Sequence, residues 1–284
     1  MKWTILFMTI LSACTSKPFK PTSWGIQLQG YEGNQSLTKI KDSKADLWVM
    51  DYMVDGKELT ATQVEILRNS HKKMISYMSI GEAEEYRFYY PTMPKDLIGS
   101  SNPDFPNNFT VNYWDPRWQE IFLSKKDGYL KRIMDAGFNG VFMDIIDAFE
   151  RFPDKDQKAE QMADFIIRIS EEAKARDKNF IIILQNGLHI RRHLKNPKRI
   201  LPAIDGVNAE SGFFYGNKDL DNAYSANVSL LEDVKFYQDH GKFVLSLEYL
   251  SSASLIDQYF SFSKIHGLIP VAAERNLKGQ FISP

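Results

Sequence analysis

The sequence predicts an α/β protein: a single (β/α)8 barrel with a long loop after its third strand. Short apolar runs alternate for most of the chain with longer segments of helical periodicity. Most of these runs end in a carboxylate, which is typical of barrel enzymes because the C-terminal strand ends form the mouth of the barrel. An open doubly wound sheet is the alternative, and the absence of a GxGxxG phosphate loop argues against it.

The elements follow one another in a regular order. The predicted strands are short apolar runs, most of them closed by an acid, an aromatic residue or a glycine: 24–30, 46–52, 73–82, 140–143, 180–184, 205–210, 243–248 and 267–273. The predicted helices carry apolar residues on one face: 60–70, 115–136, 156–176, 225–240 and 254–266. Thr60 is a plausible N-cap and Pro116 suits a first helical turn. Residues 83–112, rich in aromatic residues, proline and glycine, are predicted to form a long functional loop.

The N-terminus resembles a bacterial lipoprotein signal. A lysine precedes an apolar stretch that is too short to span a bilayer, and the lipobox-like sequence LSAC ends it at Cys14, the single cysteine of the chain. We therefore expect residues 1–13 to be a lipoprotein signal peptide, 14–23 a lipidated tether and 24–284 one (β/α)8 barrel domain. Lipidation at Cys14 would anchor the protein in the bacterial cell envelope, on the periplasmic side or at the cell surface. A plain secretory signal is the alternative.

Composition and motifs limit the function classes. The net charge of −1 gives no support for nucleic-acid binding, which needs a basic face. His189 and His193 are four residues apart, but the chain has no HExxH motif, EF-hand loop or GxSxG elbow. We therefore expect no metal and no other cofactor, and we expect a monomer.

Carboxylates at the strand ends point to the chemistry. Seven lie at or just past predicted strand ends: Asp51, Glu82, Asp144, Asp147, Glu210, Glu248 and Glu274. Like charges at one barrel mouth raise one another's pKa values, so some are expected to be protonated and others ionised. Glycoside hydrolysis needs such a pair, although any single acid is also compatible with a loop or helix-cap role. Asp144 and Glu210, which each close a buried apolar run, are the main catalytic candidates.

Three motifs carry a family resemblance. SIGEAEEYR at residues 79–87, GVFMDIID at 140–147 and VNAES at 207–211 resemble glycoside hydrolase family 114. This is the TIM-barrel family of endo-α-1,4-polygalactosaminidases. The resemblance implies a retaining hydrolase in which Asp144 is the nucleophile and Glu210 is the acid/base. We then expect Asp144 to have the lower pKa of the two.

The expected function is hydrolysis of an amino-sugar polysaccharide such as an α-1,4-linked galactosamine polymer. A carboxylate-rich mouth would attract its ammonium groups, and aromatic side chains would stack on the sugars. The predicted substrate contacts, some from the residues and some implied by the resemblance, are Asp51, Tyr52, Glu82, Tyr113, Trp114, Asp147, Asn186, Glu248 and Tyr249. The alternatives are a non-catalytic glycan-binding barrel in a cell-envelope assembly and a hydrolase of another glycan.

Overall fold

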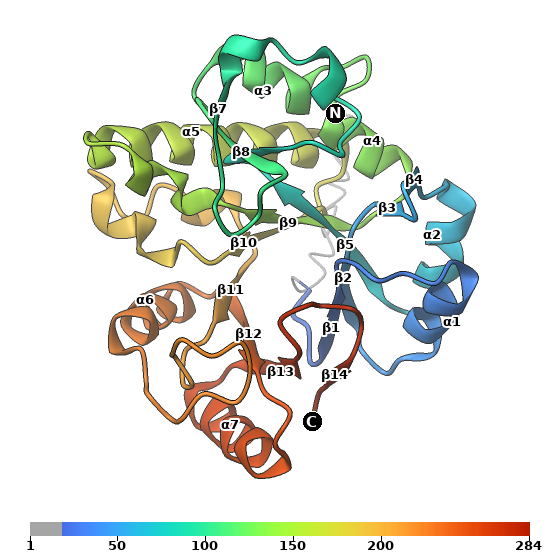
Figure 1. Cartoon of the computed structure of the whole chain (residues 1–284), viewed down its shortest axis with the longest axis vertical. Helices are drawn as coiled ribbons and strands as arrows, with labels where there is room; N and C mark the ends of the chain where they lie inside the picture. Colours follow the sequence, from blue (N-terminus) through green and yellow to red (C-terminus); the bar gives the residue numbers. More distant parts are fainter. Residues whose placement is uncertain (1–18) are drawn as a thin grey trace, which may run out of the picture.

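In the computed structural model, which describes residues 19–284, eight parallel strands form the wall of a nearly closed barrel (Figure 1). They pair in chain order, and each overlaps one of the eight predicted runs. The strands are β1 (Trp24–Gln27), β2 (Leu47–Met50), β5 (Lys73–Ser79), β9 (Gly140–Asp144), β10 (Ile181–Gln185), β11 (Gly206–Glu210), β12 (Phe243–Tyr249) and β13 (Ile269–Ala273). The predicted barrel class is confirmed.

A seam separates β13 from β1. The Trp24 indole N–H donates across it to the Ile269 carbonyl (2.9 Å). A ninth strand that was not predicted, β14 (Phe281–Ile282), pairs antiparallel with β13. Just before it, the Leu28 amide donates to the Leu277 carbonyl (3.0 Å). The C-terminal segment therefore helps to close the barrel.

Helices surround the sheet on its outside (Figure 1). They are α1 (Asn34–Asp42), α2 (Ala61–Arg68), α3 (Pro116–Leu123), α4 (Tyr129–Asp135), α5 (Lys155–Arg176), α6 (Val228–Asp239) and α7 (Ala253–His266). Thr60 caps α2 in a full capping box, as predicted. Helix α1 was not predicted, because only two of its nine residues are large and apolar. The predicted helix at 115–136 is wrong as a single element, since the chain leaves the helical conformation at Ser124 and separates α3 from α4.

The long segment after β5 is more ordered than the predicted loop. It folds into a three-stranded antiparallel sheet of β6 (Glu82–Glu84), β8 (Asn108–Val111) and β7 (Ile98–Ser101). Short elements complete the fold: the hairpin β3 (Met53–Val54) and β4 (Lys57–Glu58), and the 3-10 helices η1 (Tyr90–Thr92), η2 (Lys95–Leu97), η3 (Ile146–Arg151), η4 (Leu188–His193) and η5 (Leu201–Ala203). Glu82 thus begins a new strand instead of ending the barrel strand β5.

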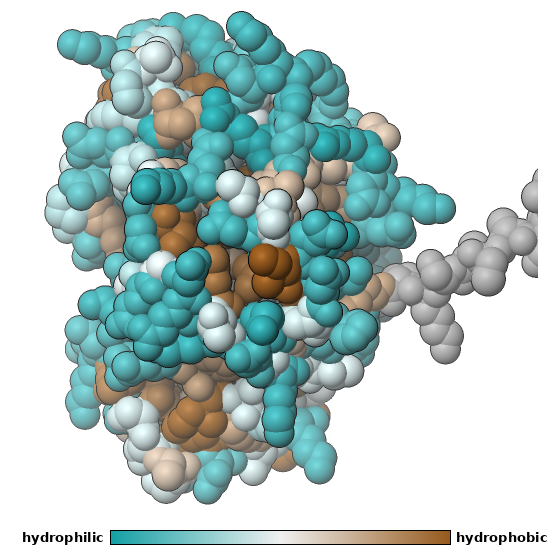
Figure 2. Space-filling model, turned by 90° about the vertical axis from the view of Figure 1, so that its right-hand side faces the viewer, coloured by the Kyte–Doolittle hydropathy of each residue, from teal (hydrophilic) through white to brown (hydrophobic). Residues whose placement is uncertain are grey.

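Two apolar layers form the core, one on each face of the barrel wall. The inner layer takes alternate residues of the strands, such as Phe142 in β9 and Leu247 in β12. The outer layer contains the other strand residues together with the helices. The face of the molecule in Figure 2 is largely hydrophilic, with its hydrophobic residues in separate patches. Within the part of the chain that the structure describes, no helix is long and apolar enough to cross a bilayer.

The predicted signal peptide and Cys14 lie outside the described residues. Of the predicted tether, residues 19–23 are described and contact the barrel. The Thr22 amide and hydroxyl both donate to Asp46 Oδ2 (2.8 and 2.7 Å), just before β2. The described chain therefore enters the barrel at the N-terminal end of its strands.

Candidate active site

A cavity of about 680 Å³ lies at the C-terminal ends of the parallel strands. It collects seven of the predicted site residues: Asp51, Glu82, Asp144, Asp147, Asn186, Glu210 and Tyr249. Seven of its lining residues are acidic, Glu84 and Asp104 among them, whereas Arg275 is the single lysine or arginine among the described lining residues. A cation entering this cavity is therefore attracted to it.

Asp144 is the last residue of β9 and points into the barrel, because it lies two residues after the inner-layer Phe142. Two groups donate to its carboxylate. The Tyr77 hydroxyl donates to Oδ2 (2.8 Å), and the Ile145 amide donates to Oδ1 (2.8 Å). This carboxylate is therefore held in one orientation at the floor of the cavity.

Glu210 ends β11 in the corresponding position, two strands away. The Asn186 side-chain amide donates to Oε2 (2.7 Å), and the Tyr249 hydroxyl donates to Oε1 (2.9 Å). The oxygen of the same Asn186 side chain accepts the Glu210 backbone N–H (3.1 Å). Asn186 thus holds both the backbone and the side chain of Glu210.

The residue that follows each of three neighbouring strands has a left-handed backbone conformation. Ile145, Asn186 and Ser211 immediately follow β9, β10 and β11, and their φ angles are 59°, 52° and 53°. This conformation is unusual for any residue with a side chain and is especially unfavourable for the β-branched Ile145. Strain of this kind gathers at functional sites, where the surrounding structure enforces it.

Burial and, to a smaller extent, the nearby charge of Glu210 raise the pKa of Asp144 to about 8, although the hydrogen bonds from Ile145 and Tyr77 act in the opposite direction. The raised pKa of Asp144 gives no support to the expectation that Asp144 has the lower pKa of the pair. The apolar wall beneath the strand end, which the sequence showed only as a buried run, outweighs the two donors. Burial also raises the pKa of Tyr77 and of Tyr249 well above the usual tyrosine value, so both hydroxyls remain donors.

Fixed donors accompany most of the other cavity acids. Buried Arg87 donates from Nη1 to Asp51 Oδ1 (2.8 Å) and from Nε to Glu84 Oε2 (2.7 Å). Glu82 forms an ion pair with Arg151 (2.5 Å). These arginines give the buried carboxylates partners of opposite charge, and an unpaired buried charge would be costly.

Asp147, in η3, differs from these acids. Its half-buried carboxylate receives no hydrogen bond and forms no ion pair from another residue within 19–284. Burial raises its pKa, and the charge of Arg151 opposes that shift. Among the cavity acids it is thus available to a bound cation.

Four residues predicted to contact substrate do not line the cavity, which corrects those predictions. Tyr52 follows the cavity-lining Asp51, and Glu248 follows the inward-facing Leu247 of β12, so both point outward into the helix layer. Tyr113 is buried, and its hydroxyl donates to the Lys158 carbonyl (2.8 Å). The Lys158 ammonium lies 3.4 Å from the centre of the Trp114 ring and covers it.

The sequence prediction also missed several lining residues. Tyr86, in the turn after β6, and Phe105, shortly before β8, are more than half exposed and suit stacking on sugar rings. Arg275 lies over the Tyr249 ring, with its guanidinium carbon 4.3 Å from the ring centre. Tyr77 and Arg275 could have been predicted from the sequence, because Tyr77 occupies an inward position of β5 and Arg275 follows the end of β13. Tyr86 and Phe105 could not have been predicted in this way.

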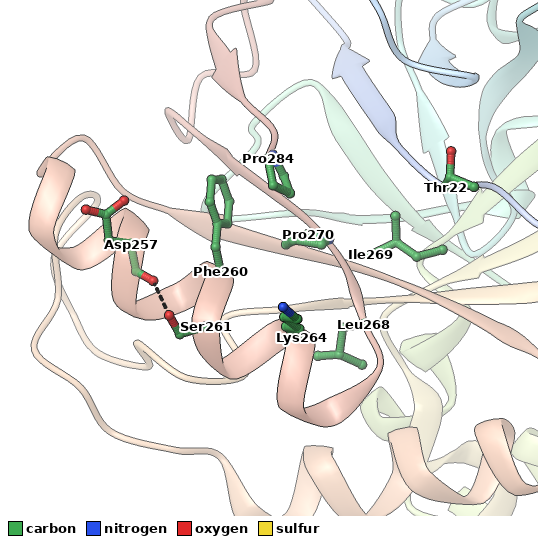
Figure 3. Close-up of a pocket in the computed structure, with 9 residues that line it drawn as sticks. All are labelled: Thr22, Asp257, Phe260, Ser261, Lys264, Leu268, Ile269, Pro270 and Pro284. Atoms are coloured by element: carbon green, nitrogen blue, oxygen red, sulfur yellow. Dashed lines mark hydrogen bonds between the residues drawn. The ribbon is translucent and has the colours of Figure 1, made fainter.

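A second cavity, of about 620 Å³, lies at the other end of the barrel (Figure 3). Thr22, before β1, and Ile269 and Pro270, at the start of β13, line it together with residues of α7. Figure 3 shows Lys264 and Asp257 there, along with the Ser261 hydroxyl donating to the Asp257 carbonyl (2.9 Å). It contains none of the strand-end acids, so the chemistry belongs to the first cavity.

The histidine pair of the sequence is engaged with acids. His189 Nε2 lies 3.0 Å from Glu150, and His193 Nδ1 lies 2.7 Å from Asp156. Across residues 19–284, no group of three or more histidine, cysteine, aspartate or glutamate side chains has an arrangement that could hold a metal ion.

A barrel with paired carboxylates facing inward from two strand ends defines a glycoside hydrolase of the barrel class. The chain belongs to glycoside hydrolase family GH114, whose family model matches residues 9–284. An uncharacterised protein of Methanocaldococcus jannaschii is 33% identical over 271 residues, which cover 88% of this chain and 75% of that protein. An uncharacterised protein of Thermotoga maritima is 29% identical over 299 residues, which cover 96% of this chain and 89% of that protein.

Two solved structures share the fold. One is Aspergillus fumigatus Ega3 in complex with galactosamine, with a TM-score of 0.70 and 19% identity over 93% of this chain and 95% of that chain. The other is the glycoside hydrolase domain of PelA from Pseudomonas aeruginosa, with a TM-score of 0.70 and 14% identity over 93% of this chain and 99% of that chain. The whole barrel is therefore common to the three proteins.

Proposed function

We propose that this glycoside hydrolase cleaves a polysaccharide containing galactosamine with free amino groups, such as an α-1,4-linked galactosamine polymer. The observation that carries the proposal is the acidic cavity, in which the paired Asp144 and Glu210 lie with further carboxylates around them. Protonated amino groups complement this charge. The fold shared with Ega3, whose structure contains galactosamine, supports the same substrate class.

The proposed reaction is a retaining displacement with Asp144 as the nucleophile. Glu210, as a carboxylic acid, donates its proton to the glycosidic oxygen while Asp144 attacks the anomeric carbon. The bond to the leaving sugar breaks and a glycosyl ester forms on Asp144. Glu210 then takes a proton from water, which hydrolyses the ester and restores both carboxyl groups.

The raised pKa of Asp144 gives the substrate charge a role in this reaction. With a pKa of about 8, Asp144 is mostly protonated at pH 7 before substrate binds, and a protonated carboxyl group is a poor nucleophile. A bound ammonium group favours the ionised form of nearby carboxylates. In this proposal the amino sugar itself ionises the nucleophile, so a neutral N-acetylated sugar is a poorer substrate.

Asp147 is the proposed partner of the ammonium group. It lines the cavity three residues after Asp144 and has no other described side chain bound to it. Of the other cavity acids, Asp51, Glu82 and Glu210 already have arginine, amide or hydroxyl partners, and Asp104 is exposed to solvent. A charge-assisted contact at Asp147 would place the cation close enough to Asp144 to lower its pKa.

The test is mass-spectrometric product analysis with purified polysaccharides. The panel contains a galactosamine polymer, its fully N-acetylated form and unrelated glycans. We expect the wild type to release oligosaccharides from the first, and Asp144→Asn and Glu210→Gln to lose most of this activity. The matched control is Asp104→Asn, which removes the charge of an exposed acid that lines the same cavity. Binding without cleavage of any glycan would favour the non-catalytic barrel, and cleavage of another glycan alone would replace the substrate.

We further propose that the protein is a monomer held in the bacterial cell envelope by a lipid on Cys14. The LSAC sequence supports this modification. Thr22 lies beside the second cavity at the N-terminal end of the strands, whereas the acidic cavity lies at the other end. An anchored chain would then present its active site away from the membrane.

A further inference from the structure

The carboxyl group of Glu248 is buried behind the active site, and the proposed reaction does not use it. Its side chain has no exposed surface, and it leaves β12 on the outer face. Oε1 accepts the Phe213 backbone N–H at 2.7 Å. Oε2 has no hydrogen-bond partner among the described residues. A group as costly to bury as this one has a role that a neutral side chain does not fill.

The partner of this carboxylate is the turn that follows Glu210. The chain runs from Glu210 through the left-handed Ser211 into Gly212, Phe213 and Phe214. The Phe213 amide donates to the Glu248 carboxylate, and the amides of Gly212 and Phe214 also favour its ionised form. Successive backbone N–H groups around one anion form a nest, here with a side chain as the anion.

Two consecutive residues of β12 therefore hold the end of β11 from its two faces. On the inner face, Tyr249 donates to Glu210 Oε1 (2.9 Å). On the outer face, Glu248 holds the backbone three residues further on. Between them, the Ser211 amide donates to the Leu247 carbonyl (2.9 Å) and continues the strand pairing. Removing the outer contact would free the turn while leaving the inner one in place.

We propose that Glu248 is a positioning residue that fixes the orientation of Glu210 by holding the turn at residues 211–214. The inference rests on the proposed role of Glu210 as the acid/base. A carboxylate suits the task because its hydrogen bonds to backbone amides are charge-assisted, and therefore shorter and stronger than those of a neutral acceptor. If Glu248 loses its charge, we expect the turn at residues 211–214 to become mobile and the Glu210 carboxyl group to lose its fixed orientation.

The surroundings of Glu248 make its charge sensitive to pH. Its pKa is raised to about 7, mainly by burial; the three backbone amides oppose this rise, and the charge of Glu210 on β11 adds to it. Tyr259 on α7 is the other titratable group that faces it. The charged form holds the turn above pH 7, and protonation weakens the hold as the pH falls through 7.

The experiment uses the full chain with Glu248→Gln, which keeps the size and one acceptor oxygen but removes the charge. Ser246→Ala is the control, since Ser246 is equally buried on the same face of the same strand. Amide hydrogen exchange is measured at residues 211–214, and the Glu210 carboxyl is titrated by carbon NMR. Turnover of a galactosamine oligosaccharide, whose leaving sugar is poor and needs a proton from the acid, gives kcat and KM.

We expect about tenfold faster exchange at residues 211–214 in Glu248→Gln and a shifted Glu210 titration, with neither change in Ser246→Ala. We also expect kcat to fall about tenfold with KM nearly unchanged, because the loss affects the acid and not sugar binding. If Glu248→Gln unfolds, Glu248→Asp is measured in its place, with the same readouts and a smaller expected effect.

Unchanged exchange and an unchanged Glu210 titration overturn the inference, and so does an equal effect in Ser246→Ala. These two readouts need no substrate. A wild type that cleaves no galactosaminide therefore counts against the proposed function, whereas Glu248 is judged by the exchange and titration results alone.

Discussion

Replacing the proposed nucleophile is predicted to stabilise the fold. The change is Asp144→Asn, which conserves shape and hydrogen bonding. An asparagine oxygen still accepts the Ile145 amide, and its NH₂ group donates to the Tyr77 oxygen in place of the present bond from Tyr77. What the substitution removes is the cost of a charged group above a buried apolar wall.

The magnitude follows from the pKa of Asp144, which is about 8 when folded and about 3.9 for aspartate in an unfolded chain. The folded protein holds this proton more tightly, so stability is lost as the pH rises from about 4 to about 8. At pH 7, ionisation in the unfolded chain favours unfolding by about 4 kcal/mol. Asp144 lines a cavity that is open to solvent, and solvent screens part of this unfavourable contribution. We therefore expect Asp144→Asn to raise the free energy of unfolding by about 1–3 kcal/mol.

Urea and thermal unfolding at pH 4, 5.5, 7 and 8.5 measure this gain. The difference between Asp144→Asn and wild type should be near zero at pH 4 and grow to its maximum near pH 8, with a Tm increase of about 2–4 °C per kcal/mol. Asp104→Asn, at the exposed cavity rim, is the control for general surface-charge effects and should show no such growth. A gain that does not depend on pH, or a destabilised variant at pH 7, would refute the reasoning.

Three further predictions concern anchoring, recognition and chemistry. Cys14→Ser should abolish palmitate labelling and release the protein from the membrane fraction; continued labelling contradicts the lipid anchor. Asp147→Asn should raise KM for a free-amine galactosamine oligomer about tenfold, the loss of one charge-assisted contact, and leave KM for an N-acetylated oligomer nearly unchanged. Equal effects on both would remove Asp147 from amine recognition. Glu210→Gln should lose about 10²-fold or more in kcat with a poor leaving group and much less with dinitrophenolate, since that leaving group needs no proton; equal losses would exclude the acid role.

The strands and the main helices could be predicted because their signals are local. The run ending in Asp144 is apolar, short and bounded by glycine, and the helix at Lys155–Arg176 repeats its apolar residues on one face. The break between α3 and α4 could not be predicted, because Trp118 and Tyr129 continue one apolar stripe across it. The small sheet at Glu82–Glu84 also escaped prediction, since its strands are short and pair with partners far along the chain.

The residues of the cavity were predictable only in part, for a reason that Glu248 illustrates. It closes an apolar run as Glu210 does, and both were predicted to face the cleft. In a strand buried on both faces, inward and outward positions are equally apolar, so the sequence does not show which face a terminal acid takes. Tyr52, one residue past the inward Asp51, was misplaced in the same way.

The sequence by itself determined the barrel class and the acids at the ends of its strands, including the pair Asp144 and Glu210. These depend on residue types along one stretch of chain. Only the tertiary structure decided which acids share the cavity, which donors hold them, and that burial raises the pKa of Asp144 to about 8. Those properties depend on side chains from several strands meeting at one end of the barrel, and the distances between them exist only once the sheet has closed.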